Sequence, residues 1–122
     1  MKIGILPCQG ACNVGVMTNK VALKFVNNDS VNMVCPLGLP LGIEHIIKMG
    51  ATNDKHIALN GCPERCASKA LESAGFTIAG EIMLTQDFGI KKNKIFNEEP
   101  NMDQVEAKVK GMLFSLSQSL TR

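Results

Sequence analysis

The sequence contains no tryptophan and no tyrosine, and phenylalanine occurs only five times in 122 residues. Single-stranded nucleic acids are bound largely by stacking on aromatic rings, and this chain has little material for such a surface. An excess of charge is missing too, since 13 lysines and arginines against 11 aspartates and glutamates give a formal net charge of +2. We therefore expect no nucleic-acid partner and no attraction to a membrane surface.

Long hydrophobic segments are also absent. The sequence has no run of about 20 apolar residues that could cross a bilayer. The apolar stretch Ile3–Leu6 is too short for the core of a signal peptide, and Pro-Cys follows it. Apolar residues nevertheless make up 45% of the chain, which is enough to bury a core. We expect a single domain over residues 1–122, located in the cytoplasm, that carries a cysteine-based site.

The feature that the sequence has in excess is cysteine. There are five: Cys8, Cys12, Cys35, Cys62 and Cys66. An odd number without a secretory signal does not suit a framework of disulfides. In a reducing compartment, clustered cysteines serve more often as metal ligands or catalytic thiols. Five isolated thiols, each buried as a small hydrophobic side chain, are the alternative without a function.

Four short apolar segments predict β-strands. They are expected at Lys2–Leu6, Val31–Val34, His56–Leu59 and Glu81–Thr85. None of them alternates cleanly between apolar and polar residues. Continuous apolar strands are typical of a parallel sheet that is covered on both faces.

Apolar residues at spacings of three and four predict helices between and after these strands. The helices are expected from Asn13 to about Asn27, from about Ile43 to Gly50, from Ala67 to Gly75, and from a cap at Asn101 to about Leu120. This alternation predicts an α/β fold, a single three-layer α/β/α domain with a small, mainly parallel four-stranded sheet. We expect its strands in the order 2-1-3-4.

Every cysteine follows the carboxyl end of a predicted strand. Cys8 follows the first strand, Cys35 the second and Cys62 the third. Cys12 and Cys66 each come four residues after the first cysteine of their own loop. Ligands of open α/β sheets bind at this edge. If the first and third strands are neighbours, their two C-x-x-x-C loops face each other, and Cys35 lies beside them at a strand spacing of about 4.8 Å.

The loop after the third predicted strand favours thiolates. Pro63 suits the first position of a helix, which would place Cys62 near the helix cap and Cys66 about one turn further on. The partial positive charge of a helix N-terminus lowers the pKa of a thiol. Four thiolates around Zn²⁺ leave two negative charges to be offset. Three nearby cations are candidates for this role: Arg65, Lys69 and Lys20.

The spacing of the cysteines favours a metal site over isolated thiols. We expect Zn²⁺ to be bound by Cys8, Cys12, Cys62 and Cys66, with Cys35 as a substitute or an additional ligand. An iron–sulfur cluster uses the same ligands, and the sequence does not separate the two. A thiol redox or sulfur-transfer enzyme is another candidate, with Cys62 as nucleophile and Cys66 or Cys8 as the resolving thiol. An adaptor that uses a metal only to hold its loops is a third, although no feature identifies its protein partner.

The remaining polar residues are expected to be structural. His45 falls within the second helix and His56 at the far end of the third strand, and neither has ligand spacing to a cysteine. Asp87 follows the fourth strand but suits a turn. Segment 88–100, which contains three lysines, is expected to be an irregular surface connection whose lysines are solvated.

Three blocks around the cysteines resemble the DGC-domain family of cysteine-rich α/β proteins. They are Cys8–Gly15, Val34–Gly38 and Leu59–Ala67, and the similarity extends from Met1 to about Gly89. The resemblance implies a site that holds zinc, and it implies no reaction. The family takes its name from Asp-Gly-Cys, whereas Asn60 stands first here. An amide still caps a helix, but it brings no charge and no acid for proton transfer.

Overall fold

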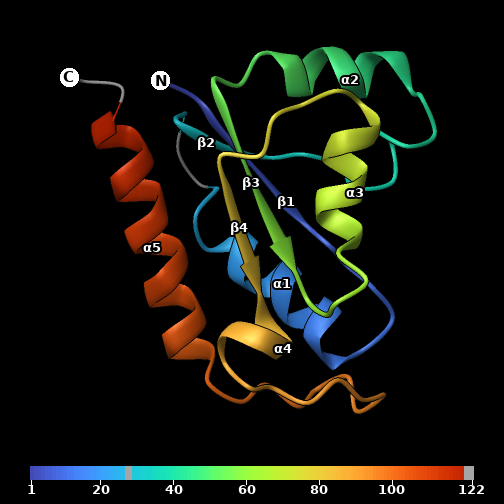
Figure 1. Ribbon diagram of the computed structural model, residues 1–122, viewed down its shortest axis with the longest axis vertical. Coiled ribbons are helices and arrows are strands. Elements are labelled where there is room, and N and C mark those ends of the chain that lie inside the picture. The colour runs from blue at the N-terminus through green and yellow to red at the C-terminus, as the bar shows by residue number, and fades with distance from the viewer. Residues whose placement is uncertain (27–28, 120–122) are drawn as a thin grey trace.

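The computed structural model describes residues 1–26 and 29–119 and contains a four-stranded sheet (Figure 1). Its strands are β1 (Ile3–Pro7), β2 (Val31–Met33), β3 (Lys55–Asn60) and β4 (Gly80–Met83). They lie in the order β2-β1-β3-β4, and every neighbouring pair is parallel. The predicted fold class and strand order are confirmed.

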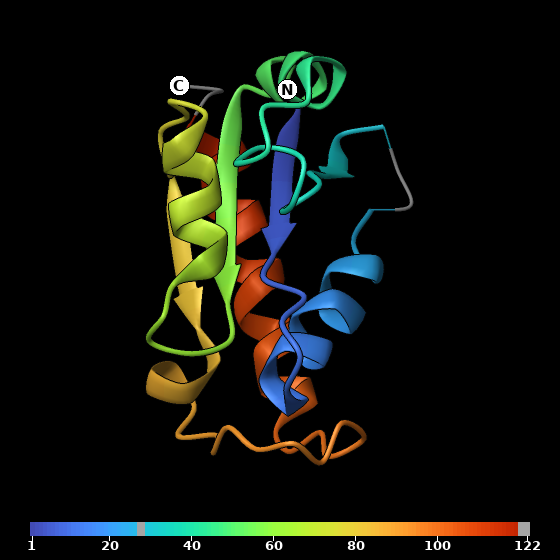
Figure 2. The same ribbon diagram turned by 90° about the vertical axis from the view of Figure 1, so that its right-hand side faces the viewer.

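Helices cover both faces of this sheet (Figure 2). Two of them, α1 (Asn13–Leu23) and α5 (Met102–Ser119), pack on one face, and α3 (Cys66–Ser73) packs on the other together with residues of α2 (Glu44–Ala51). The short helix α4 (Leu84–Asp87) follows β4 directly. Among the described residues, no helix combines the length and apolar character needed to cross a membrane.

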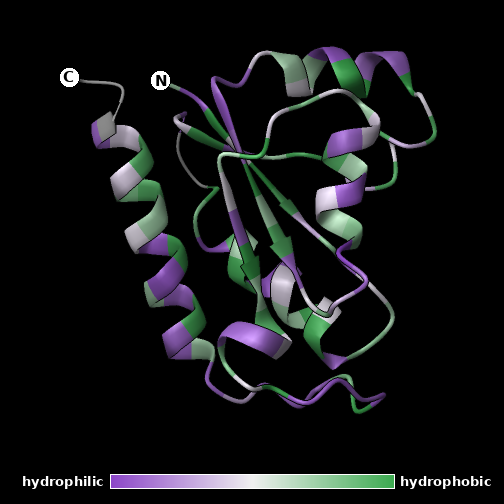
Figure 3. Cartoon of the chain, in the orientation of Figure 1, coloured by the Kyte–Doolittle hydropathy of each residue, from purple (hydrophilic) through white to green (hydrophobic). Residues whose placement is uncertain are grey.

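The two central strands divide the core into two hydrophobic clusters, because successive side chains of a strand point to opposite faces. Ile5 and Ile57 pack into the cluster that α1 and α5 complete. Leu6 and Ala58 pack into the other cluster, against Leu71 of α3. In Figure 3 the middle parts of β1 and β3 are accordingly hydrophobic, whereas α5 mixes polar and apolar residues. The carboxyl-terminal edge of the sheet is therefore supported by packed apolar side chains on both faces.

The fourth strand is shorter than predicted. It ends at Met83, and the two residues expected to complete it, Leu84 and Thr85, lie in α4 instead. The carboxylate of Asp87 accepts the N–H of Met83 at 2.9 Å, which closes this single helical turn. Asp87 thus forms a turn, as predicted, but one turn of helix rather than a loop.

The first helix also ends earlier than predicted. After Leu23, the N–H groups of Lys24 and Phe25 donate to carbonyls three residues back, at 3.1 Å each, so the chain tightens out of the α-helix. The predicted stop at Asn27 lies outside the described residues, as does Leu120 at the end of the last helix.

Candidate cysteine site

The two C-x-x-x-C loops leave the same edge of the sheet from neighbouring strands. β1 pairs with β3 so that Pro7 lies opposite Leu59. The N–H of Cys8 donates to the carbonyl of Leu59 at 3.0 Å, which extends the pairing by one residue into the first loop. A Cβ atom on Gly61 would lie 3.0 Å from the side chain of Val14, so the second loop packs directly on the start of α1. The predicted meeting of the two loops is confirmed.

The first loop folds back over the beginning of α1. The N–H of Gly10 donates to the sulfur of Cys8 at 3.3 Å, and the N–H of Cys12 donates to the carbonyl of Gly10 at 3.0 Å. A Cβ atom on Gly15 would lie 2.2 Å from that same carbonyl oxygen. Only glycine at position 15 lets the loop approach the helix this closely, and the approach fixes where both cysteines lie.

The second loop differs from the prediction at the start of α3. The N–H of Arg65 donates to the carbonyl of Cys62 at 3.1 Å, which closes a turn with Pro63 at its second position. Arg65 has a left-handed φ of 54°, and the helix begins at Cys66. Cys62 therefore lies in a turn, and Cys66 is the first helical residue rather than one turn further on. Pro63 suits both arrangements, and bonds from outside the loop select the turn.

One of those bonds is an ion pair that anchors Arg65. Its guanidinium donates to both carboxylate oxygens of Glu81, at 2.5 and 3.1 Å. The pair lowers the pKa of the Glu81 carboxyl and raises the pKa of Arg65, in each case chiefly through the hydrogen bond between them. Arg65 is therefore held by carboxylates of Glu81 and Glu72.

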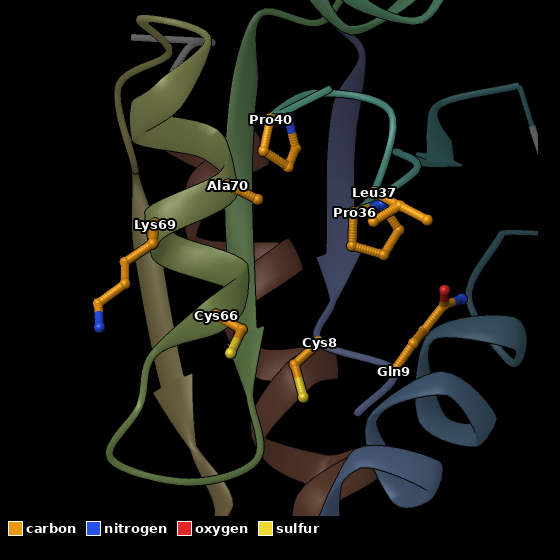
Figure 4. Close-up of a pocket in the computed structure, with 8 residues that line it drawn as sticks. All are labelled: Cys8, Gln9, Pro36, Leu37, Pro40, Cys66, Lys69 and Ala70. Atoms are coloured by element: carbon orange, nitrogen blue, oxygen red, sulfur yellow. The ribbon is translucent and has the colours of Figure 1, made fainter. Parts of the chain in front are cut away.

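An open cleft of about 490 Å³ lies between the first cysteine loop, the β2–α2 connection and α3 (Figure 4). The residues that line it are Cys8, Gln9, Pro36, Leu37, Pro40, Cys66, Lys69 and Ala70. The cleft thus unites the first cysteine of one loop with the last cysteine of the other. Cys8 is half-buried and Cys66 is exposed, and both are free thiols. Ligands can reach this pair of sulfur atoms from solvent.

The other two thiols of the loops lie beneath the surface. Cys12 is 5% exposed and Cys62 is 8% exposed, and both belong to the hydrophobic cluster on the α1 and α5 side. The ammonium group of Lys92 donates to the sulfur of Cys62 at 3.5 Å. The contact with Cys62 raises the pKa of Lys92, with a further contribution from Cys12. Lys92 belongs to the connection predicted to be a solvated loop, so sequence reasoning missed its place at the site.

The pKa of the Cys66 thiol is raised, not lowered as expected at a helix N-terminus. Burial raises the pKa of the Cys66 thiol, and the neighbouring Cys8 and Cys62 raise it further, while Lys69 opposes them. Thiolates so arranged repel each other, and a cation between them would relieve that repulsion. Of the cations predicted to do so, Lys69 lines the cleft and Lys20 pairs with Glu99 at 2.5 Å.

The chemistry of the donors fits a soft metal ion, but a complete set of ligands is not assembled. Within residues 1–26 and 29–119, no three cysteine, histidine, aspartate or glutamate side chains lie close enough together to hold a metal ion. Cys35 has an exposed thiol and lines a separate pocket of about 90 Å³ with Ile46 and Met49 of α2. The structure thus brings four of the predicted ligands to two adjoining loops and places the fifth against α2.

Neither histidine lines the cysteine cleft. His45 is exposed on α2. His56 is buried at the opposite end of β3 from the cysteines, where its Nε2 lies 2.9 Å from the carbonyl of Gly50 and its ring stacks on Phe76 with centroids 4.6 Å apart. Burial lowers the pKa of His56, so the ring is neutral at physiological pH.

Comparison with known proteins identifies one family. The sequence model of the DGC domain matches residues 4–112, which is most of the chain and includes all five cysteines. No curated protein and no solved structure matches the chain.

Proposed function

The chain belongs to the DGC-domain family, and on that premise we propose that its two cysteine loops bind a soft metal ion, with Zn²⁺ as the first candidate. The observation that carries the proposal is the position of the loops: two C-x-x-x-C segments follow the adjacent strands β1 and β3 at one edge of the sheet. Thiolates are the preferred ligands of Zn²⁺ in such sites.

The proposed ligands are Cys8 and Cys66 in the open cleft and Cys12 and Cys62 below it. Their charge supports the assignment, because thiolates that repel one another gain from a shared cation. Since the ligands are near each other but not assembled, metal binding would draw the loops together, so that binding and local ordering are coupled. Four thiolates would make zinc structural, and three would leave it an open position for a further ligand.

We further propose that the protein works in a reducing compartment such as the cytoplasm. Its cysteines are free thiols, and clustered thiols persist where disulfides are reduced. An oxidising compartment would favour oxidation of these thiols, and oxidised cysteines could not serve as the proposed ligands.

The test is the metal and acid-labile sulfide content of protein purified without oxygen and without an affinity tag. We expect about one colourless zinc ion per chain. Changing Cys8, Cys12, Cys62 or Cys66 to serine should weaken zinc binding, as measured by chelator competition, by at least about tenfold. Cys35→Ser is the matched control and should bind as the wild type does. Iron with sulfide would indicate a cluster, and metal-free protein with five titratable thiols would refute the proposal.

A thiol redox or sulfur-transfer enzyme is the second candidate. The shared cleft of Cys8 and Cys66 supports it, because both thiols are open to a small substrate. Cys62, the proposed nucleophile with Cys66 or Cys8 as its partner, is only 8% exposed and lies below that cleft, so a substrate would have to reach it past the two open thiols. Alkylation separates the two functions. One hyperreactive thiol favours the enzyme, whereas thiols that stay protected until a chelator is added favour the metal site.

A further inference from the structure

We propose that Lys92 is a positioning residue of the cysteine site, whose ammonium group holds the sulfur of Cys62 and supplies positive charge to the thiolate cluster. The inference rests on the proposed function, but a measurement on metal-free protein can overturn it separately. Lys92 comes from the connection between α4 and α5, 30 residues after Cys62 in the chain.

The backbone around Lys92 is fixed to the first cysteine loop by Asn13, the residue after Cys12. Asn13 is completely buried, and its side chain donates to the carbonyl of Lys91 at 2.9 Å. The same side chain accepts the N–H of Asn93 at 2.7 Å, and the backbone N–H of Asn13 donates to the carbonyl of Asn93 at 3.0 Å. Three hydrogen bonds thus bracket Lys92 on both sides. The backbone position of Lys92, from which its side chain reaches Cys62, is therefore fixed.

The next lysine strengthens the attachment. The ammonium group of Lys94 donates to the carbonyl of Ala11, inside the first cysteine loop, at 2.6 Å. Segment 91–94 therefore contacts both cysteine loops, one through Lys94 and the other through Lys92. This position covers the Cys12 and Cys62 side of the site and leaves the cleft with Cys8 and Cys66 open.

The contact between Lys92 and Cys62 places a positive charge beside a proposed metal ligand. Four thiolates around a divalent ion leave two negative charges, and hydrogen bonds to ligand sulfur atoms stabilise such sites. Lys92 contacts the sulfur of Cys62, whereas the side chain of Lys69 points away from Cys8 and Cys66 (Figure 4). Lys92 is therefore the lysine placed to offset negative charge on the Cys12 and Cys62 side of the site.

The experiment compares Lys92→Met and Lys92→Arg with the wild type. Lys91→Met is the matched control, because Lys91 is exposed and its side chain has no hydrogen bond or ion pair among the described residues. The first readout is zinc affinity by chelator competition. We expect Lys92→Met to bind about tenfold more weakly, Lys92→Arg to recover most of the loss, and Lys91→Met to equal the wild type. Unchanged melting of the metal-free variants verifies that they are folded.

The second readout needs no metal. Iodoacetate is anionic and iodoacetamide is neutral, so the ratio of their alkylation rates at one cysteine reports the local charge and cancels accessibility. Peptide mapping should show this ratio falling about fivefold at Cys62 in Lys92→Met at low salt, with less change in high salt. The ratio at Cys35, remote from Lys92, is the internal reference.

The outcomes separate the two proposals. An unchanged ratio at Cys62 in Lys92→Met would overturn the inference, and so would an equal loss of zinc affinity in Lys91→Met. A wild-type protein that binds no zinc would refute the proposed function. A charge-dependent ratio in that same protein would still support the place of Lys92 beside Cys62.

Discussion

The side-chain oxygen of Asn60 accepts the backbone N–H of Ser68 at 3.1 Å, across the segment that contains Cys62 and Cys66. The N–H belongs to the first turn of α3, so the completely buried Asn60 caps that helix from outside. Its amide nitrogen donates to the hydroxyl of Ser68 at 2.9 Å and to the carboxylate of Glu81 at 3.3 Å. An aspartate, which gives the family its name, could accept the same N–H but would have no proton for Glu81.

Asn60→Asp is therefore expected to destabilise the protein at pH 7 by about 1–3 kcal/mol, because a buried donor is lost and two carboxylates face each other. The pKa of the new carboxyl would be raised by burial and by Glu81, so the loss should shrink as the pH falls towards 5 and this group binds a proton. Urea denaturation at both pH values measures the effect. Asn19→Asp is the control, since that side chain accepts from Gln9 at 2.6 Å and a carboxylate does so too. Equal losses at both pH values would contradict this account.

A second prediction concerns the glycine under the first cysteine loop. Gly15→Ala would place a methyl group 2.2 Å from the carbonyl oxygen of Gly10, so the loop must move. We expect a loss of about 1–3 kcal/mol in the free energy of unfolding, together with weaker zinc binding. Gly111→Ala, in the exposed part of α5, adds a Cβ that meets no atom within 4 Å beyond the adjacent backbone of its own helix, and it should instead stabilise by about 0.5–1 kcal/mol. A Gly15→Ala variant with unchanged zinc affinity would show that the loop position is not required.

The sheet could be predicted because each strand and helix has a recognisable pattern within its own short stretch of sequence. Four apolar segments separated by helical patterns allow few arrangements, and short right-handed crossovers limit them further. The cysteines directly after Pro7 and near Asn60 then fall at one edge by geometry alone. Short elements are harder to predict. The helix α4 consists of only four residues and continues an apolar segment that resembles a strand.

The remaining parts of the site depend on contacts between distant residues. The start of α3 is set by Asn60 and by the pairing of Arg65 with Glu81, whereas Pro63 alone allows two starting points. The position of Lys92 follows from hydrogen bonds of Asn13 to residues about 80 positions later in the chain. The sequence pattern around α3 does not predict where that helix starts. The pattern around Lys92 does not predict its contact with Cys62.

A third prediction follows from the buried histidine at the far end of the sheet. Burial lowers the pKa of His56 below its ordinary value of 6.5. The unfolded chain therefore takes up a proton at a higher pH than the folded protein does. The stability associated with neutral His56 is complete above pH 6.5 and declines as the pH falls below it, by at most about 1.4 kcal/mol per pH unit. Urea denaturation between pH 7 and pH 5 should show this decline in the wild type and in His45→Gln, but less of it in His56→Gln. An identical slope in His56→Gln would assign the decline to other groups.

The last prediction distinguishes the two exposed thiols in metal-free protein. Cys35 and Cys66 are both accessible, but the pKa of Cys66 is raised by partial burial and then by Cys8 and Cys62. Because the thiolate is the reactive form, iodoacetamide at pH 7.5 should label Cys35 before Cys66, and the difference should narrow as the pH rises. Cys62→Ser removes one of the repelling groups, so Cys66 should react faster in that variant, while Cys35 should keep its rate. Labelling of Cys66 ahead of Cys35 in the wild type would mean that nearby cations outweigh the thiols, and repulsion among the thiols would then no longer favour a bound metal.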